Sequence, residues 1–292
     1  MDNLTHGLLG YALYAATDTK ALSRKEQIGY AAAAVLGAEI PDIESFTTFF
    51  GSEAYLTWHR AFTHSFLFAP VMALLAAGIV SLFNRSVRRK KAFLLALAGV
   101  FIHILSDLFN SWGTGIWEPF DHGRYSLGIV PIVDIVILLI LFSAWLARRF
   151  AARANAFRWA WAGIACYVTL QGIMAAVAVD RIPDGYDRVA TAAQFVPTQF
   201  QIIVKRGDRF EYWKSTGFAP PVKETVIEDD QHHPTVTQAL RDPEARAIAR
   251  FAPFYGAAVT EENDSYRVTI YDPRFRFLYP SLVSKTVTVP KE

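Results

Sequence analysis

The chain has one cysteine, Cys166, so no intrachain disulfide can form. Cysteine usage therefore says nothing about the redox compartment, and we interpret Cys166 as a small packing residue in an apolar helix. An excess of charge of one sign is also missing, because 29 lysines and arginines are balanced by 27 acidic residues and the formal net charge is only +2. So weak an excess argues against a nucleic-acid partner.

Several catalytic motifs are absent as well. The sequence has no glycine-rich phosphate loop, no nucleophile elbow and no His-Glu-x-x-His pattern. The last absence argues against a zincin-type protease. The first residues also lack the basic segment and the cleavage site of a signal peptide, so we expect residue 1 to begin the mature protein.

Apolar runs are plentiful, and they are concentrated in residues 1–180. Hydrophobic residues make up 52% of the chain, and its mean hydropathy is +0.21. We predict a membrane domain over 1–180 with about six helices, at 4–17, 28–40, 66–83, 92–109, 128–147 and 159–179. The first two are short, their small residues favour a tight hairpin, and whether they fully span stays open. Pro41 is expected to end the second helix.

The basic residues predict the orientation of these helices. The turns at 18–27, 84–91 and 148–158 hold twelve lysines and arginines, whereas the opposite loops, 41–63 and 109–127, hold only Arg60 and Arg124. The positive-inside rule then places the three basic turns in the cytoplasm. We therefore expect a multi-pass protein of a bacterial inner membrane, with its N-terminus and its C-terminal domain outside the cytoplasm.

Residues 181–292 resemble an ordinary soluble domain in composition. Alternating stretches predict strands at 199–204, 209–213, 223–227, 266–271 and 285–289. Residues 238–251 predict one amphipathic helix with Asp242-Pro243-Glu244 at its start. We therefore expect a smaller, β-rich α+β domain. Upstream, residues 45–58 form a predicted aromatic loop of the kind found at a membrane interface.

Ionisable residues collect in the membrane half of the chain. The stretch His59-Arg60-Ala61-Phe62-Thr63-His64-Ser65 directly precedes an apolar run, where such residues are expensive unless they bind something. His103 and Asp107 lie one helical turn apart on the same helix face. Imidazoles and carboxylates are the ligands of a divalent metal, and the residues that we expect to bind it directly are His6, Asp42, His64, His103 and Asp107. His59, Asp121, His122 and Asp134 are further candidates, as additional ligands or as partners of the ligands.

Simpler interpretations remain open for single residues. His6 can be a packed histidine, and His59 can be an anchor at the interface. His103 and Asp107 can share a hydrogen bond without a metal. Asp134 can be a structural hydrogen-bonding residue within its helix, although an acid in a membrane segment suggests function.

These motifs resemble those of the bacterial YdjM-like membrane-bound metal-dependent hydrolases. The matching segments are Thr5-His6, Pro41-Asp42-Ile43-Glu44, His59 to Ser65, His103 to Asp107, and Gly115 with Pro119-Phe120. Ala61 replaces the usual glycine, and Glu44 stands where a second aspartate is common. The resemblance covers about residues 1–150. More distantly, the order of the motifs is similar to that of the zinc-dependent phospholipase C and P1-type nuclease group, although two later ligands of that group have no clear counterpart here. That similarity implies phosphoester hydrolysis.

From the residues and the resemblance together, we expect a membrane-bound hydrolase with one to three divalent ions, zinc first. Arg60 would bind the anion of a small-molecule or lipid phosphoester, and Glu44 or Asp121 would act as base. The partners expected are membrane lipid and this substrate. Two alternatives belong to other classes: a metal- or proton-coupled transporter that uses His103, Asp107 and Asp134, and a non-catalytic membrane scaffold with a structural metal.

Overall fold

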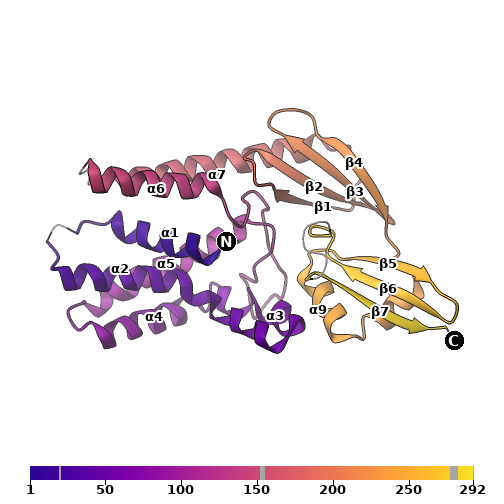
Figure 1. Cartoon of the computed structure of the whole chain (residues 1–292), viewed down its shortest axis with the longest axis horizontal. Helices are drawn as coiled ribbons and strands as arrows, with labels where there is room; N and C mark the ends of the chain where they lie inside the picture. The colour runs from indigo at the N-terminus through magenta and orange to yellow at the C-terminus, as the bar shows by residue number, and fades with distance from the viewer. Residues whose placement is uncertain (20, 152–154, 277–281, 292) are drawn as a thin grey trace. The chain divides into compact units, whose positions relative to one another are not determined.

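The computed structural model describes residues 1–19, 21–151, 155–276 and 282–291 (Figure 1). A helical N-terminal part is followed by a β-rich C-terminal part, which confirms the predicted fold class. All six predicted apolar helices are present: α1 (Asn3–Ala15), α2 (Arg24–Glu39), α4 (Ala69–Phe83), α5 (Arg89–Phe109), α6 (Ile135–Phe150) and α7 (Ala156–Asp180).

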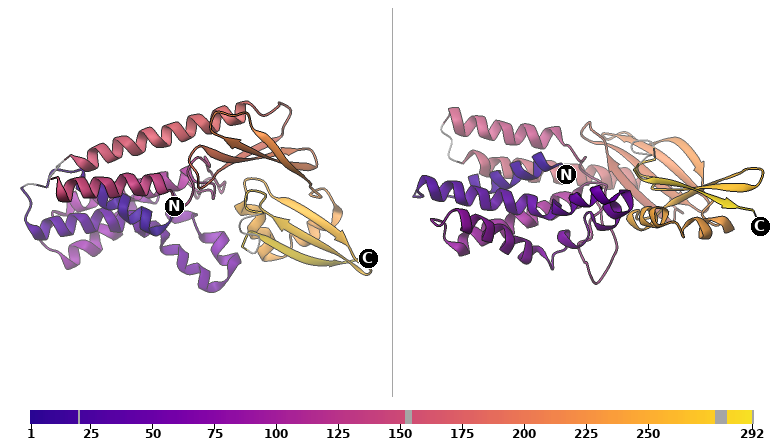
Figure 2. Two further views of the ribbon diagram at one scale, coloured as in Figure 1. Left: turned by 45° about the horizontal axis from the view of Figure 1, so that its top comes forward. Right: turned by 60° about the horizontal axis from the view of Figure 1, so that its bottom comes forward.

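The chain divides into two compact units. The first contains residues 1–44, 60–126 and 130–171, and the second contains 45–59, 127–129 and 172–292. Our sequence prediction drew one boundary, between 180 and 181. The helices α1, α2, α4 and α5 pack side by side within the first unit, as both views of Figure 2 show.

Only some of these helices are long enough to cross a membrane. By length and composition α5 and α7 qualify, and the pair Ser52–His64 and Ala69–Phe83, bent by 86°, would make a third span. A single crossing needs about 20 residues. The helices α1, α2, α4 and α6 have 13, 16, 15 and 16 residues, so the described part of the chain has two or three candidate spans.

Small residues bring α2 and α5 into backbone contact. A side chain at Gly37 of α2 would overlap the backbone of Ala96, and a Cβ at Gly99 of α5 would lie 2.5 Å from the Ala34 carbonyl oxygen. Helices that cross this closely need glycine or alanine at the contact. Ser23 and Glu26 form a capping box at the start of α2, and the helix ends at Glu39, before Pro41 as predicted.

Two boundaries in the helical part differ from our predictions. The aromatic segment expected to be a loop is instead helical, as the 3-10 helix η1 (Ile40–Phe50) and the short helix α3 (Ser52–Trp58). The helix predicted from residue 128 begins only at Ile135. Its N-cap is Asp134, whose side chain accepts hydrogen bonds from the backbone N–H groups of Val136 and Ile137, so the preceding residues lie outside the helix.

The described residues of the three basic turns lie at one end of the helices of the first unit (Figure 1). Asn84 donates a 2.7 Å hydrogen bond to the Lys25 carbonyl, which joins the first two turns. Arg148 donates to the Ala15 carbonyl at 2.6 Å, which brings the third turn to the same end. Because α5 begins at this basic end, its last turn, with Asp107, lies at the opposite end.

The described residues of the β-rich part form two antiparallel sheets. One has the strand order β1 (Arg188–Ala193), β2 (Gln199–Arg206), β3 (Arg209–Thr216), β4 (Val222–Glu228), and the other β5 (Gly256–Glu261), β6 (Ser265–Tyr271), β7 (Ser284–Pro290). The five predicted strands are present, whereas β1 and β5 were missed. The predicted helix 238–251 is wrong at its start, because Pro243 begins a new helix, α9 (Pro243–Phe251), after α8 (Pro234–Ala239).

Candidate metal centre

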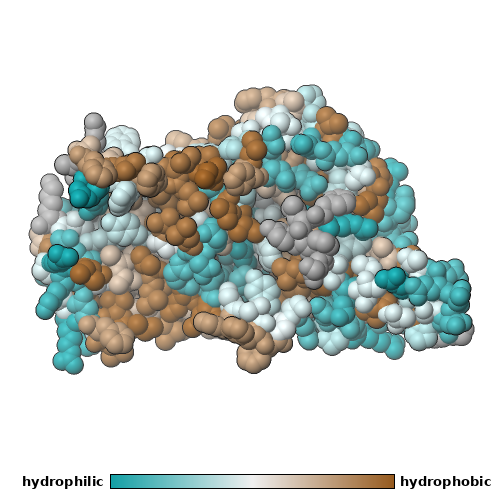
Figure 3. All heavy atoms as spheres, in the orientation of Figure 1, coloured by the Kyte–Doolittle hydropathy of each residue, from teal (hydrophilic) through white to brown (hydrophobic). Residues whose placement is uncertain are grey.

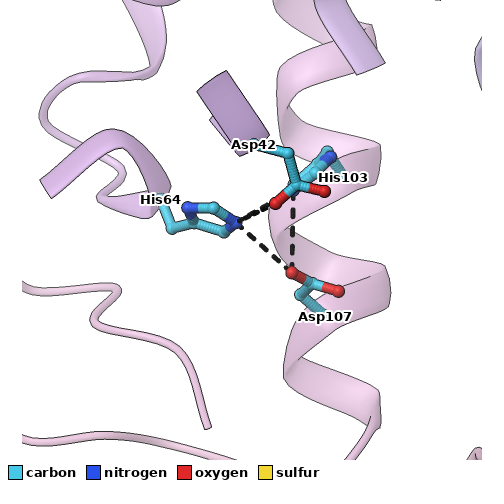
Figure 4. A group of neighbouring side chains, drawn as sticks. All are labelled: Asp42, His64, His103 and Asp107. Carbon is cyan, nitrogen blue, oxygen red and sulfur yellow. Dashed lines mark hydrogen bonds and ion pairs between the residues drawn. The ribbon is translucent and has the colours of Figure 1, made fainter. Parts of the chain in front are cut away.

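Four side chains converge inside the first unit (Figure 4). Asp42 lies in η1 just after α2, and His64 ends the 3-10 turn η2 (Phe62–His64) before α4. His103 and Asp107 project from the same face of α5. One ligand atom from each residue lies within 4.8 Å of the other three. Asp42 is 8% exposed and the other three are fully buried, so the cluster lies in a medium where unpaired charge is expensive.

The separations of the ligand atoms match those of a metal site. The Nε2 atoms of His64 and His103 are 2.9 Å apart. Asp107 Oδ2 lies 3.3 Å from the first and 3.6 Å from the second, and Asp42 Oδ1 lies 3.4 and 3.6 Å from them. In a tetrahedral site with metal–ligand bonds of about 2.0–2.1 Å, neighbouring ligand atoms are about 3.3 Å apart. The cluster therefore has the size that such a site requires.

Both imidazole rings are held by their outer nitrogen. His103 Nδ1 lies 2.6 Å from the Ala38 carbonyl oxygen, and His64 Nδ1 lies 3.0 Å from Glu44 Oε1. A ring that donates from Nδ1 carries its lone pair on Nε2 when it is neutral, which is the form that binds a metal. Glu44 is itself held, because it accepts hydrogen bonds from the Arg60 backbone N–H and the Thr63 hydroxyl.

Asp107 uses its two oxygens differently. Oδ1 accepts hydrogen bonds from Arg60 Nη2 at 3.0 Å and Asn110 Nδ2 at 3.2 Å, and it forms an ion pair with the α-amino group of Met1. Oδ2 faces the two histidines and has no hydrogen-bond donor among the described residues. Asp42 Oδ1 lacks a donor there as well. These two buried, orphaned oxygens beside two Nε2 atoms fit a cation.

The surroundings of Asp42 favour the ionised form of its carboxyl group. Burial raises the pKa of this group, but the neighbouring His103 and His64 imidazoles outweigh burial and bring it well below its usual range. Imidazole and carboxylate ligands must be deprotonated to bind a metal, so the metal affinity of such a site increases with pH.

His6 lies beside the four residues. Its ring stacks on His103 with 3.8 Å between centroids, and its Nε2 is 3.4 Å from Asp107 Oδ1. Its Nδ1 lies 3.3 Å from the Ser106 hydroxyl, which donates to the His103 carbonyl and therefore accepts from His6. The Nε2 atom of a third imidazole ring thus lies next to the cluster and faces Asp107.

Arg60 contributes a buried positive charge. Its guanidinium bridges Asp107 and Asn110, with Nη1 2.8 Å from Asn110 Oδ1. Its backbone has a φ of 58°, in the left-handed region that non-glycine residues rarely adopt. Gly115 donates to the Arg60 carbonyl at 2.8 Å, so the loop after α5 stabilises this conformation.

The other predicted site residues lie outside the cluster. His59 stacks on Tyr55 with 4.5 Å between centroids. Asp121 is exposed and accepts a hydrogen bond from the Tyr125 hydroxyl, and His122 pairs with Glu118 at 2.8 Å. Asp134 caps α6 and accepts a 2.8 Å hydrogen bond from the Tyr167 hydroxyl, which is the structural role left open above.

Sequence reasoning missed two residues that hold the cluster, Ser106 and Asn110. Ser106 follows His103 by three residues, and Asn110 follows Asp107 by three residues. Residues three apart lie on the same side of a helix, so this spacing could have predicted both. Ser106 orients His6, and Asn110 contacts both Asp107 and Arg60.

Glu44 provides a first test, because it touches His64 without belonging to the four ligand residues. We expect Glu44→Gln to weaken metal binding about 10- to 100-fold, since the amide no longer fixes the ring as the carboxylate does. Asp121→Asn is the matched control: it also changes a carboxylate to an amide, and we expect it to leave affinity unchanged. Competition with a chromogenic chelator measures the metal affinity of both variants. An affinity of Glu44→Gln equal to that of Asp121→Asn would contradict the role of Glu44.

Comparison with known proteins agrees with the membrane character and the motifs. The sequence model of the family described as "YdjM inner membrane protein" matches residues 1–178, which include all four cluster residues. The "Uncharacterized protein YfhP" of Bacillus subtilis (strain 168) is 24% identical over 294 residues, covering 94% of this chain and 87% of that protein. No solved structure matches. Since the family model covers more than half of its length, the chain belongs to the YdjM inner membrane protein family.

Proposed function

We propose that this protein is a membrane-bound, metal-dependent hydrolase of phosphoesters, with lipid phosphoesters as the favoured substrates. The observation that carries the proposal is the buried set of four ligand atoms within 4.8 Å of one another, with a buried arginine beside it. Asp42, His64, His103 and Asp107 would hold the metal. Two imidazoles and two carboxylates favour zinc among the common divalent ions.

The reaction that this site favours follows from its charges. A divalent metal polarises a phosphoryl oxygen and lowers the pKa of a water molecule. Arg60 supplies the guanidinium that an anionic substrate requires, and its Nε has no hydrogen-bond partner among the described residues. His6 Nε2, next to Asp107, is the group that would serve as a further ligand when the metal expands its coordination or a second ion binds.

The place of the site in the membrane supports a lipid substrate. The cluster lies at the end of α5 opposite the basic turns, and the positive-inside rule assigns basic turns to the cytoplasm. The site would then open at the headgroup level of the outer leaflet. In this proposed orientation, both termini would lie outside the cytoplasm.

A structural metal is the second candidate, and one observation favours it. Four protein ligands complete a tetrahedral zinc site, as in structural zinc sites, whereas catalytic sites keep one position for water. A transporter receives less support, because Asp134, which that hypothesis used, caps a helix instead of extending a polar path from the cluster.

The test separates metal binding from turnover. We expect the purified protein to hydrolyse bis(p-nitrophenyl) phosphate or a phospholipid in mixed micelles. The variant Arg60→Lys should keep its metal, but its kcat/KM should fall by about 100-fold, because lysine lacks the planar guanidinium that binds a phosphate with two hydrogen bonds. Arg149→Lys, at an exposed residue of α6, is the control. A wild type that holds metal tightly but hydrolyses neither substrate would instead support the structural metal.

A further inference from the structure

A groove runs along the helices of the first unit, between α2 and α4. Both helices pack against α5, and the space between their outer faces has a volume of about 860 Å³. Its apolar walls consist of Ile28, Ala32, Val35, Leu36, Ile79, Val80 and Phe83. Ile28 is 59% exposed and Phe83 is 89% exposed, so these large side chains need an apolar environment. Figure 3 shows apolar residues spread over the helices.

The two ends of the groove differ in charge. Lys25 and Arg85 lie at the end formed by the basic turns, together with the polar residues Asn84 and Ser86. Both cations are exposed, and neither forms an ion pair within the part of the chain that the structure describes. An apolar groove with an unpaired cationic mouth is complementary to an anionic amphiphile.

The mouth is built by close contacts between α2 and the turn that follows α4. Asn84 donates to the Lys25 carbonyl, and a Cβ at Gly29 would collide with the Val87 side chain. Asn84 also accepts a 3.2 Å hydrogen bond from the Ser86 N–H. These contacts hold the backbones of Lys25 and Arg85 at the same end of the groove.

The length of the groove fits one leaflet of a bilayer. From Lys25 to Leu36 the helix advances 11 residues, or about 16 Å at the α-helical rise. Half of the bilayer hydrocarbon thickness is about 15 Å. The carboxyl of Glu39 lies beyond this apolar stretch and marks its end.

We propose that the groove between α2 and α4 is a binding site for an anionic phospholipid. Lys25 and Arg85 bind the phosphate, and an acyl chain lies along the apolar walls toward Leu36. A zwitterionic lipid carries a compensating ammonium group and loses most of this attraction. The proposal does not depend on the hydrolase activity, because the groove is lined by none of the four metal-cluster residues.

Native mass spectrometry of the full-length protein in detergent tests the site. The probes are phosphatidylglycerol and phosphatidylcholine with identical acyl chains. We expect the wild type to retain phosphatidylglycerol at least about tenfold better. The double variant Lys25→Glu/Arg85→Glu should lose this preference, and Ala32→Trp, which fills the groove, should lower retention of both lipids.

Two controls make the result specific. Ala165→Trp adds the same bulk at an exposed alanine of α7, and Arg149→Glu reverses an exposed charge on α6; both should match the wild type. Equal retention of the two lipids by the wild type would overturn the proposal. Lipid retention by Ala32→Trp equal to that of the wild type would also overturn it. An equal loss of retention in Ala165→Trp would overturn it as well, because it would show that the lipid binds as ordinary annular lipid. The charge-reversed variant alters only exposed side chains and decides the question even if Ala32→Trp does not fold.

Discussion

Replacing His64 by alanine, or Asp107 by asparagine, is expected to remove the bound metal. The first change deletes one of four ligand groups, and the second replaces a charged carboxylate by a neutral amide, in a cluster of buried residues. We expect the content to fall from about one ion per chain to below about a tenth of that, because a buried site with three ligands binds far more weakly. Elemental analysis of detergent-purified protein measures this directly.

The matched control for this experiment is Asp134→Asn. Asp134 is also a buried acid of the first unit, 2% exposed, but it caps α6 and pairs with Tyr167. Asparagine is as good an N-cap as aspartate, so we expect this variant to keep both its fold and its metal. If the His64 and Asp107 variants hold as much metal as Asp134→Asn, the assignment of the four ligands is wrong.

The substitution Gly99→Ala is expected to lower both stability and metal affinity. The added methyl group would lie 2.5 Å from the Ala34 carbonyl oxygen and 2.9 Å from the Ala38 backbone nitrogen, and backbone atoms cannot rotate away. Overpacking of this kind lowers the free energy of unfolding by about 2–3 kcal/mol. The added methyl group also pushes α2 away from α5. This moves the Ala38 carbonyl, which holds His103, and the segment after α2 that carries Asp42, so the metal affinity should fall as well.

Gly78→Ala is the control, since a Cβ at Gly78 on α4 meets no atom within 4 Å. Alanine has the higher helix propensity, so this variant should be as stable as the wild type or more stable by up to about 1 kcal/mol. Thermal unfolding in detergent, with metal content measured on the same samples, compares the two. Equal melting temperatures would show that α2 and α5 have room to separate.

The sequence by itself determined the elements and the chemistry. Apolar runs long enough for helices, with Pro41 as a stop, located the six apolar helices, although η1 and α3 were missed, and period-two alternation located five of the seven strands in the described residues. The pair His103 and Asp107 was readable because two residues four apart share one face of a helix. Asp42 and His64 were readable only as unusual polar residues beside apolar helices.

Only the tertiary structure decided which of these residues meet. His59 is five residues from His64 and was a further candidate for a ligand, but His59 stacks on Tyr55 whereas His64 enters the cluster. Glu44, predicted as a base, lies against the outer nitrogen of His64, and Asp134 caps a helix. The side chains that are able to bind a metal can be read directly from the sequence. Convergence depends on helix crossings such as Gly37 against Ala96, where backbone contact between distant segments fixes the distances.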